Sequence, residues 1–311
     1  MNQILVSGLI NIETTLRIDQ FPLNYFPVTY PFFGVQSTIS GVGFNVAKAL
    51  KTLGNQINFL SIIGSDFYQS IIKAELNNIG LEDEFILPML SQTAQSVIIY
   101  EKSGRRQIHT DLKDIQDHQY PLEQFNQSMQ GCNLCVMCNV NFNRHLLHIA
   151  KDHNKIIATD VHAISDPDHP YDREFMAVAD ILFLSHENLN TSPQNFIQAL
   201  WDRYQNKIIV VGMGEQGALL GIKGSHIILR IPAIQTRTVI NTIGAGDALF
   251  SAFLDTFLRS KDPVLALQQA VLFASQKIGT TGAAEGFIDF PTLSALFDQH
   301  KRQLQPIPVD L

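Results

Sequence analysis

A run of small residues, Gly244-Ala245-Gly246, stands between an apolar strand end and a long helical pattern at residues 248–258. These residues have almost no side chain, so their backbone N–H groups can face an open space where the helix begins. A helix N-terminus combines unpaired donors with the positive end of the helix dipole, and therefore attracts phosphate or developing negative charge. The pattern predicts an anion hole.

Asp247 follows in the first turn of the same helix. A carboxylate repels phosphate, so it does not suit phosphate binding. It suits a general base that takes a proton from an attacking hydroxyl while the amides hold a transferring phosphoryl group. The alternative is an ordinary helix cap, because Asp is favoured there and Gly-Ala-Gly also fits a plain loop. The motif alone leaves both interpretations open.

Residues 241–247, N-T-I-G-A-G-D, resemble the D-T-x-G-A-G-D signature of the ribokinase-like (PfkB) carbohydrate kinase family. Upstream, residues 40–47 resemble the family's G-G-x-G-x-N-x-A signature, with Ser40 in place of the first Gly, and Gly54 and Gly64 follow. Two long motifs in the right order and spacing are a specific signal, and the resemblance covers nearly the whole chain. It implies ATP-dependent phosphorylation of a hydroxymethyl group, with Mg²⁺ bridging the donor phosphates.

The resemblance also implies where the acceptor binds. Glu13 occupies the position of a family Asp that hydrogen-bonds substrate hydroxyls, one methylene longer, although a solvated loop charge is the alternative. Val42 stands where phosphosugar kinases of the family often carry Lys, which favours an unphosphorylated acceptor. The acceptor-binding residues implied are Asn11, Glu13, Gly41, Gly43 and Asn45.

The choice between a sugar and a nucleoside acceptor stays open in the sequence. Aromatic residues of the predicted lid, Tyr25, Phe26, Phe32 and Phe33, suit stacking on a base or simple packing of the lid sheet. A non-catalytic sugar- or nucleotide-binding regulator on the same fold is the alternative from another functional class. An NAD-dependent oxidoreductase fits poorly, because the only G-x-G-x-x-G run continues into a strand instead of a helix.

On the nucleotide side, residues 212–217 resemble the family's T-x-G-x-x-G hairpin, with Gly in place of the Thr. Small residues of the helix at 264–278 suit an adenine ring or close helix packing. The nucleotide-binding residues implied are Gly212, Gly214, Gly217, Thr242 and Ser275.

Metal binding is implied at Asp160, which ends a predicted strand, and at Glu187. The family usually shows N-x-x-E at the next strand end, where its Glu helps to position magnesium. Here His186 and Leu189 occupy those two places, so Glu187 is the substitute. Polar loop residues are the alternative interpretation.

The order of elements predicts an α/β fold, in which a doubly wound, mainly parallel sheet lies between helices as one domain over residues 1–311. Two β-rich excursions, at 14–39 and 94–110, interrupt the alternation and predict a small β lid that excludes water. A homodimer through this lid is also expected from the resemblance.

The composition of the chain limits the classes of partner that are expected. A net charge of -7 without a Lys/Arg-rich run argues against nucleic acid. No apolar run reaches transmembrane length, and the N-terminus lacks a basic, cleavable leader, so a cytoplasmic location without membrane contact is expected.

Cys132, Cys135 and Cys138 form a C-x-x-C-x-x-C run that is typical of iron–sulfur or zinc sites. The chain has no fourth cysteine, and the segment is predicted to be a buried strand, whose alternating faces keep the thiols apart. We therefore expect small buried hydrophobic residues.

Asn241 generates a testable prediction. In the family, the Asp at this position often lines a potassium site, and the amide lacks its negative charge. Coulomb attraction dominates at a weakly selective site for a hard cation, so we expect potassium to activate this enzyme weakly or not at all. The measurement is activity in buffer free of sodium and potassium, then with potassium added. Strong activation at low potassium would contradict the prediction.

Overall fold

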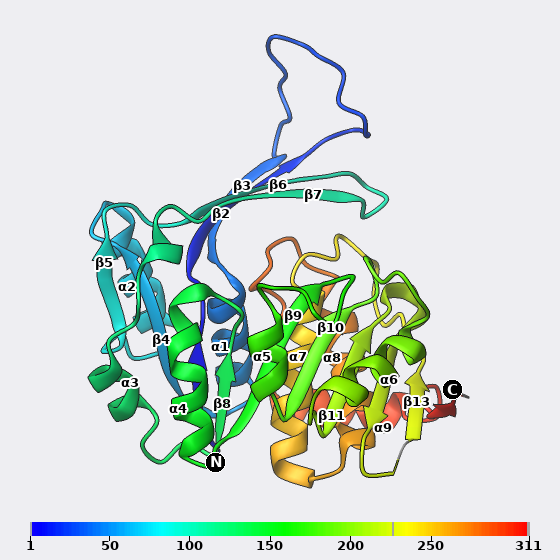
Figure 1. Cartoon of the computed structure of the whole chain (residues 1–311). Helices are drawn as coiled ribbons and strands as arrows, with labels where there is room; N and C mark the ends of the chain where they lie inside the picture. The colour runs from blue at the N-terminus through cyan, green and yellow to red at the C-terminus, as the bar shows by residue number, and fades with distance from the viewer. Residues whose placement is uncertain (1, 226, 310–311) are drawn as a thin grey trace.

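A ten-stranded sheet forms the centre of the protein, as the computed structural model shows for residues 2–225 and 227–309 (Figure 1). Its order is β14-β13-β12-β11-β10-β9-β8-β1-β4-β5, and all pairs from β11 to β5 are parallel, whereas β12, β13 and β14 are antiparallel. The predicted α/β class is confirmed. The strands are β1 (Gln3–Ser7), β4 (Gln56–Gly64), β5 (Ile86–Leu90), β8 (Leu134–Met137), β9 (Ile156–Ala163), β10 (Ile181–Ser185), β11 (Ile208–Gly212), β12 (Ala218–Ile222), β13 (Ile227–Ile231) and β14 (Ile307–Pro308).

Helices cover both faces of this sheet because its strands are apolar on both sides. In β1, Ile4 and Val6 belong to one buried cluster and Leu5 to the other. The first cluster packs α1 (Val42–Thr52), α2 (Tyr68–Asn78), α7 (Ala245–Ser260), α8 (Pro263–Lys277) and α9 (Phe290–His300). The second packs α3 (Leu122–Ser128), α4 (Leu147–Asp152), α5 (Arg173–Val178) and α6 (Pro193–Arg203).

A second sheet of four strands, the small sheet, extends above one end of the strands of the large sheet (Figure 1). Its order is β3-β2-β6-β7, with β2 parallel to β6 in the interior. The strand β2 begins at Asn11, before the β-rich excursion expected from residue 14, so Asn11 and Glu13 are part of this sheet. The strands are β2 (Asn11–Arg17), β3 (Val35–Ser40), β6 (Gln95–Tyr100) and β7 (Arg106–Asp111).

The segment that joins β2 to β3, residues 18–34, extends away from the body of the protein and is called the arm below (Figure 1). Its aromatic residues were expected to pack the lid sheet or to stack on a base. The structure places them in solvent instead: the exposed fractions are 90% for Tyr25, 65% for Phe26, 79% for Phe32 and 98% for Phe33. The expectation that these rings pack the lid sheet is therefore wrong for this chain taken alone, and stacking on a base stays a prediction.

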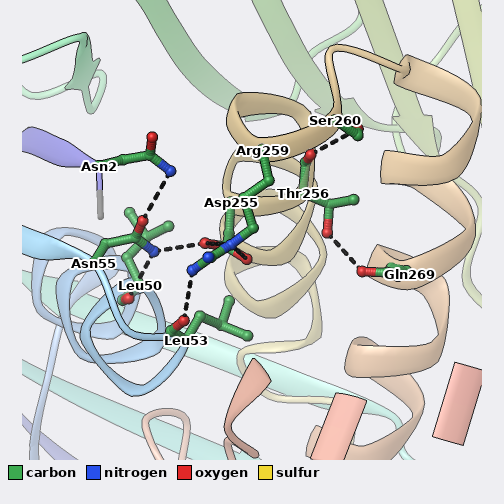
Figure 2. A network of polar contacts seen from close by, with 9 residues as sticks. All are labelled: Asn2, Leu50, Leu53, Asn55, Asp255, Thr256, Arg259, Ser260 and Gln269. Carbon is green, nitrogen blue, oxygen red and sulfur yellow. Dashed lines mark hydrogen bonds and ion pairs between the residues drawn. The ribbon is translucent and has the colours of Figure 1, made fainter. Parts of the chain in front are cut away.

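A polar network fastens α1 to α7 at their C-terminal ends (Figure 2). Asp255 on α7 is fully buried, and its carboxylate accepts a hydrogen bond from Asn55 Nδ2 (2.8 Å) and pairs with Arg259 Nε (2.9 Å). Arg259 Nη2 also donates to the carbonyl of Leu53, which caps α1 (2.9 Å). Because the bonds from Asn55 to Asp255 and from Arg259 to the Leu53 carbonyl each join α7 to the end of α1, this network fixes the two helices relative to each other.

The three cysteines are buried as predicted, and β8 covers only the middle of their segment. Cys132 and Cys135 pack in the cluster on one face of the sheet and Cys138 in the cluster on the other, so the three thiols do not converge, although only Cys138 is on the opposite face. Burial raises the pKa of Cys132 to about 11 and of Cys135 to about 12, which keeps both protonated.

In the described part of the chain, no helix is long and apolar enough to cross a membrane.

Candidate active site

Glycines bring the start of α1 against the end of β1. Gly41 has a φ of 102°, and a Cβ there would lie 2.5 Å from the carbonyl oxygen of Leu9. A Cβ on Gly43 would lie 2.4 Å from the carbonyl carbon of Gly8. The space beside Gly43 is thus filled by backbone, and the missing side chain lets α1 pack on β1. This corrects the expectation that Gly43 makes room for the acceptor.

Asn45 on α1 holds the predicted base. Its Nδ2 donates to Asp247 Oδ2 on α7 at 2.7 Å. Its Oδ1 lies 3.2 Å from the hydroxyl of Ser40, so both ends of the amide have partners. Asn45 therefore orients Asp247 in this structure, whereas the sequence assigned it to the acceptor.

Ser40 extends this arrangement to the small sheet. Its hydroxyl lies 3.0 Å from Glu13 Oε2 and 3.2 Å from Asn45 Oδ1, and its single proton can serve one of them at a time. Glu13, Ser40, Asn45 and Asp247 consequently form one row of polar contacts, called the polar row below. The row joins the small sheet, α1 and α7.

Two buried acceptor atoms at the end of this row have no partner in the described part of the chain. They are Glu13 Oε1 and Asn11 Oδ1, on residues that are 5% and 4% exposed. Asn11 Nδ2 donates to Ser96 Oγ at 3.0 Å, which fixes the direction of its amide. A buried acceptor without a donor is costly, so these atoms are suited to receive hydroxyl groups of a ligand.

The predicted anion hole lies where α7 begins. Gly244 adopts the left-handed conformation (φ 76°), and a Cβ there would lie 2.3 Å from the carbonyl oxygen of Ala283. The N–H of Ala245 donates to Thr242 O at 3.2 Å, so it is used within the loop. Helix geometry leaves the N–H groups of Gly246 and Asp247 without intrahelical partners, and a Cβ on Gly246 would meet open space. These two amides are therefore the donors that remain for the predicted anion hole, in place of the Ala245 amide.

Hydrogen bonds hold the loop before the anion hole. Asn241 is 1% exposed; its Nδ2 donates to Thr281 O (2.7 Å), and its Oδ1 accepts from the N–H of Ile243 (3.0 Å). The N–H of Ile240 donates to Ile278 O at 2.8 Å. Both polar atoms of the Asn241 side chain are thus engaged by the protein itself, and weak activation by potassium stays a prediction.

The surroundings of Asp247 suit a base. Burial raises the pKa of Asp247 to about 6, the hydrogen bond from Asn45 and the charge of His162 oppose this rise, and Asp160 and Glu13 add to it. Burial also raises the pKa of Glu13, against the Ser40 hydroxyl and Lys277. A base with a pKa near the working pH accepts a proton readily and still gives it up.

The residues predicted to bind the nucleotide have different surroundings from one another in the structure. Gly214 and Gly217 form the turn between β11 and β12, and Gly212 O accepts from His186. Ser275 is buried and bonded to Thr236 Oγ1 (2.8 Å) and Leu272 O (2.7 Å), which favours the alternative of helix packing. The hydroxyl of Thr242 accepts from Arg106 Nη1 at 2.8 Å.

The predicted metal ligands do not form a cage. Asp160 is buried and accepts from the N–H of His162 (2.8 Å), whereas Glu187 is half exposed and lies 3.6 Å from Arg106 Nη2. No group of three or more His, Cys, Asp or Glu residues that could hold a metal lies in the described part of the chain. The carboxylates of Asp160 and Glu187 still suit Mg²⁺, because this ion binds through one or two carboxylates and the phosphates of a substrate.

Comparisons with known proteins show the family of the chain. The sequence model of the pfkB family of carbohydrate kinases matches residues 1–289. The chain belongs to this family. It is 23% identical to the acarbose 7(IV)-phosphotransferase of Actinoplanes sp., over 92% of this chain and 95% of that protein.

Two solved structures show the same fold. The microbiome-derived acarbose kinase Mak1 superimposes with a TM-score of 0.86 at 23% identity, covering 96% of this chain and 99% of Mak1. The nucleoside kinase of Burkholderia thailandensis, solved in complex with inosine, gives 0.77 at 15% identity, covering 97% and 100%.

Three side chains of this pfkB-family site were missed in the sequence. Ser40 was noted only as a departure from the signature, although a hydroxyl in a glycine position signals a polar partner. Arg106 lies in β7, and its contact with Thr242 depends on a pairing of distant segments. Lys277 is fully buried at the end of α8, where a charged residue in an apolar helix was the available signal.

Asp247 generates a prediction for catalysis. We expect Asp247→Asn to lower kcat by about 10²–10⁴-fold with nearly unchanged nucleotide affinity, because the amide cannot accept the proton. In the wild type, kcat/KM is expected to fall as pH drops through about 6, where the carboxylate becomes protonated. Steady-state kinetics from pH 4.5 to 8 measure both effects, with the exposed Asp298→Asn as the control. Full turnover by Asp247→Asn would contradict the assignment of Asp247 as the base.

Proposed function

We propose that the protein transfers the γ-phosphoryl group of ATP to a hydroxymethyl group of a small, unphosphorylated sugar. The observation that carries this proposal is the contact of Asn45 Nδ2 with Asp247 Oδ2 (2.7 Å), which aims a base beside the free amides of the first turn of α7. The same contact disfavours a non-catalytic regulator, because a binding protein needs no oriented base.

The reaction follows from these groups. Asp247 takes the proton of the acceptor hydroxyl as its oxygen attacks the γ-phosphorus, the bond from this phosphorus to the β,γ-bridging oxygen breaks, and ADP leaves. The amides of Gly246 and Asp247 and the helix dipole stabilise the charge on the transferring group. Mg²⁺ supplies charge neutralisation on the donor phosphates, and Asp160 would hold it, directly or through water.

The acceptor side favours a neutral polyol. Asn11 Oδ1 and Glu13 Oε1 are free to accept hydrogen bonds from sugar hydroxyls. The carboxylates of Glu13, Asp160 and Asp247 influence one another, so together they would repel a phosphorylated acceptor. A similarity to an acarbose phosphotransferase supports a sugar in this place. The nucleoside alternative loses its support within this chain, because the aromatic residues of the arm are exposed.

The small sheet would act as the lid. Arg106 on β7 reaches Thr242 in the loop before the anion hole and lies near Glu187 at the end of β10. Its guanidinium therefore links the lid to the donor side, where a cation also suits phosphate oxygens. A closed lid excludes water and prevents hydrolysis of ATP. We place this reaction in the cytoplasm, where ATP is available.

A substrate screen tests the proposed acceptor. We expect free sugars to be phosphorylated with a higher kcat/KM than sugar phosphates or nucleosides, because the acceptor side is negative and has no stacking ring from its own chain. The measurement is ADP release with a panel of neutral sugars, their phosphates and nucleosides, and Asp247→Asn is the control for background hydrolysis. Faster turnover with a phosphosugar or a nucleoside would overturn this choice.

The arm supports a homodimer through the lid. Exposed aromatic residues gathered on one protruding segment are typical of a protein interface, and a second copy of this chain is the partner we propose. We expect light scattering to show a dimer in solution. A variant in which Tyr25, Phe26, Phe32 and Phe33 are all replaced by Ser is expected to be a folded monomer. A monomeric wild type at micromolar concentration would contradict the proposal.

A further inference from the structure

Ser40 is the member of the polar row for which the reaction above gives no role. It ends β3, is 1% exposed, and lies between Glu13 on β2 and Asn45 on α1. Its hydroxyl oxygen is 3.0 Å from Glu13 Oε2 and 3.2 Å from Asn45 Oδ1. Both of these atoms are acceptors, and Ser40 carries the only hydroxyl proton of the row. One of the two acceptors therefore goes without this proton at any moment.

Glu13 is the stronger of the two acceptors while the acceptor site is empty. A hydrogen bond to an ionised carboxylate is roughly twice as strong as one to a neutral amide oxygen. Glu13 is 5% exposed and its Oε1 has no partner in the described part of the chain, so its demand for donors is high. The Ser40 proton then lies on Glu13, and Asn45 Oδ1 faces a hydroxyl oxygen without a proton.

The position of this proton decides how firmly Asn45 is held toward the base. With the proton on Asn45 Oδ1, both ends of the amide are fixed, one by Ser40 and one by Asp247 at 2.7 Å. With the proton on Glu13, only the bond to Asp247 remains. A half-turn of the amide, which lets Nδ2 donate to the Ser40 oxygen, then competes with that bond. The polar row thus has two arrangements.

An acceptor hydroxyl changes the balance between these arrangements. When it donates to Glu13 Oε1, it satisfies part of the carboxylate charge and weakens the hold of Glu13 on the Ser40 proton. The proton can then turn to Asn45 Oδ1 without movement of a heavier atom, because both acceptors already lie within hydrogen-bond distance of the same oxygen. The bonds from Ser40 to Asn45 and from Asn45 to Asp247 then form a chain whose members strengthen one another.

We propose that Ser40 is a positioning residue that couples occupation of the acceptor site to the base. Its proton lies on Glu13 in the empty site and turns to Asn45 when an acceptor hydroxyl donates to Glu13. The proposal rests on the kinase reaction proposed above and adds a control to it. Asn45 holds Asp247 firmly only when a hydroxyl is in place, so hydrolysis of ATP without an acceptor is suppressed. A sugar hydroxyl is kept on Glu13 by the rest of the sugar, whereas a water molecule exchanges.

Glu13→Gln tests this coupling through a gain of activity, which damage to the fold does not produce. A neutral amide attracts the Ser40 proton less than a carboxylate does, so the proton serves Asn45 even in the empty site. We expect ADP release without sugar to rise about two- to tenfold, the effect of one hydrogen bond, while transfer to sugar falls. The measurement is ADP release from ATP with and without sugar. Hydrolysis equal to or slower than that of the wild type would refute the proposal.

The double variant Glu13→Gln/Ser40→Ala shows whether this rise depends on Ser40. We expect the rise to disappear, because the proton that serves Asn45 is gone. A rise that persists without the hydroxyl would assign the effect of Glu13→Gln to easier entry of water, and would overturn the proposal.

Ser40→Ala alone separates coupling from simple support of Glu13. We expect kcat for transfer to fall about two- to tenfold, while the KM for the sugar does not rise, because Glu13 Oε2 becomes free to accept. Ser61→Ala is the matched control: Ser61 on β4 is fully buried, and its hydroxyl has no partner among the described residues. It should leave both quantities unchanged. A raised KM with an unchanged kcat for Ser40→Ala would show that Ser40 only holds Glu13, and would contradict the proposal.

A double-mutant cycle tests the resting position of the proton without any assay of activity. We expect the urea midpoints of Ser40→Ala, Glu13→Gln and the double variant, measured without sugar, to be non-additive, because the two residues share one charge-assisted hydrogen bond. Additive shifts would show that the Ser40 proton does not lie on Glu13 and would refute the proposal. A non-additive cycle in a wild type that phosphorylates no acceptor would instead contradict the proposed function and leave the bond from Ser40 to Glu13 established.

Discussion

The hydrogen bond from Asn45 to Asp247 is the contact on which the rest of the site depends, because it joins the N-terminal ends of two helices that are distant in sequence. Its short length requires α1 and α7 to keep a fixed separation and rotation. The network of Asp255, Arg259 and Asn55 at the opposite ends of the same helices provides this (Figure 2). Rigid helices fastened at both ends can hold a base more closely than a loop can.

The candidate site contains both negatively and positively charged groups. Glu13, Asp160 and Asp247 bring negative charge to a place that must also accept the phosphates of a donor. Free amides at the start of α7 and Arg106 from the small sheet supply positive charge near Thr242 and the helix start. Burial raises the pKa of Asp247 to about 6; the hydrogen bond from Asn45 and the charge of His162 oppose this rise, and Asp160 and Glu13 add to it. A carboxylate with this pKa is ionised at neutral pH and suits the proposed role of base.

Departures from the family signatures are matched by contacts elsewhere in the chain. Glu13 is longer than the usual Asp, and Ser40, which replaces a glycine, donates to its carboxylate at 3.0 Å. Asn241 replaces another Asp, and its amide hydrogen-bonds Thr281 and Ile243 within the chain. The substitutions at Glu13, Ser40 and Asn241 therefore each have a hydrogen-bond partner within the chain.

The sequence by itself determined the family, the parallel sheet and the residues around Asp247. These features depend on short-range patterns: apolar runs, glycines at fixed spacing and a helix start. The sequence also marked the three cysteines as buried, because their segment reads as an apolar strand.

Only the tertiary structure decided the contacts of Asn45, Gly43 and Arg106 and the exposure of the aromatic arm. The three contacts depend on which distant segments meet: α1 with α7, β1 with α1, and β7 with the loop before α7. Hydrogen-bond geometry and desolvation act through space, so residues more than 200 positions apart, such as Asn45 and Asp247, set each other's chemistry in ways that local spacing does not encode.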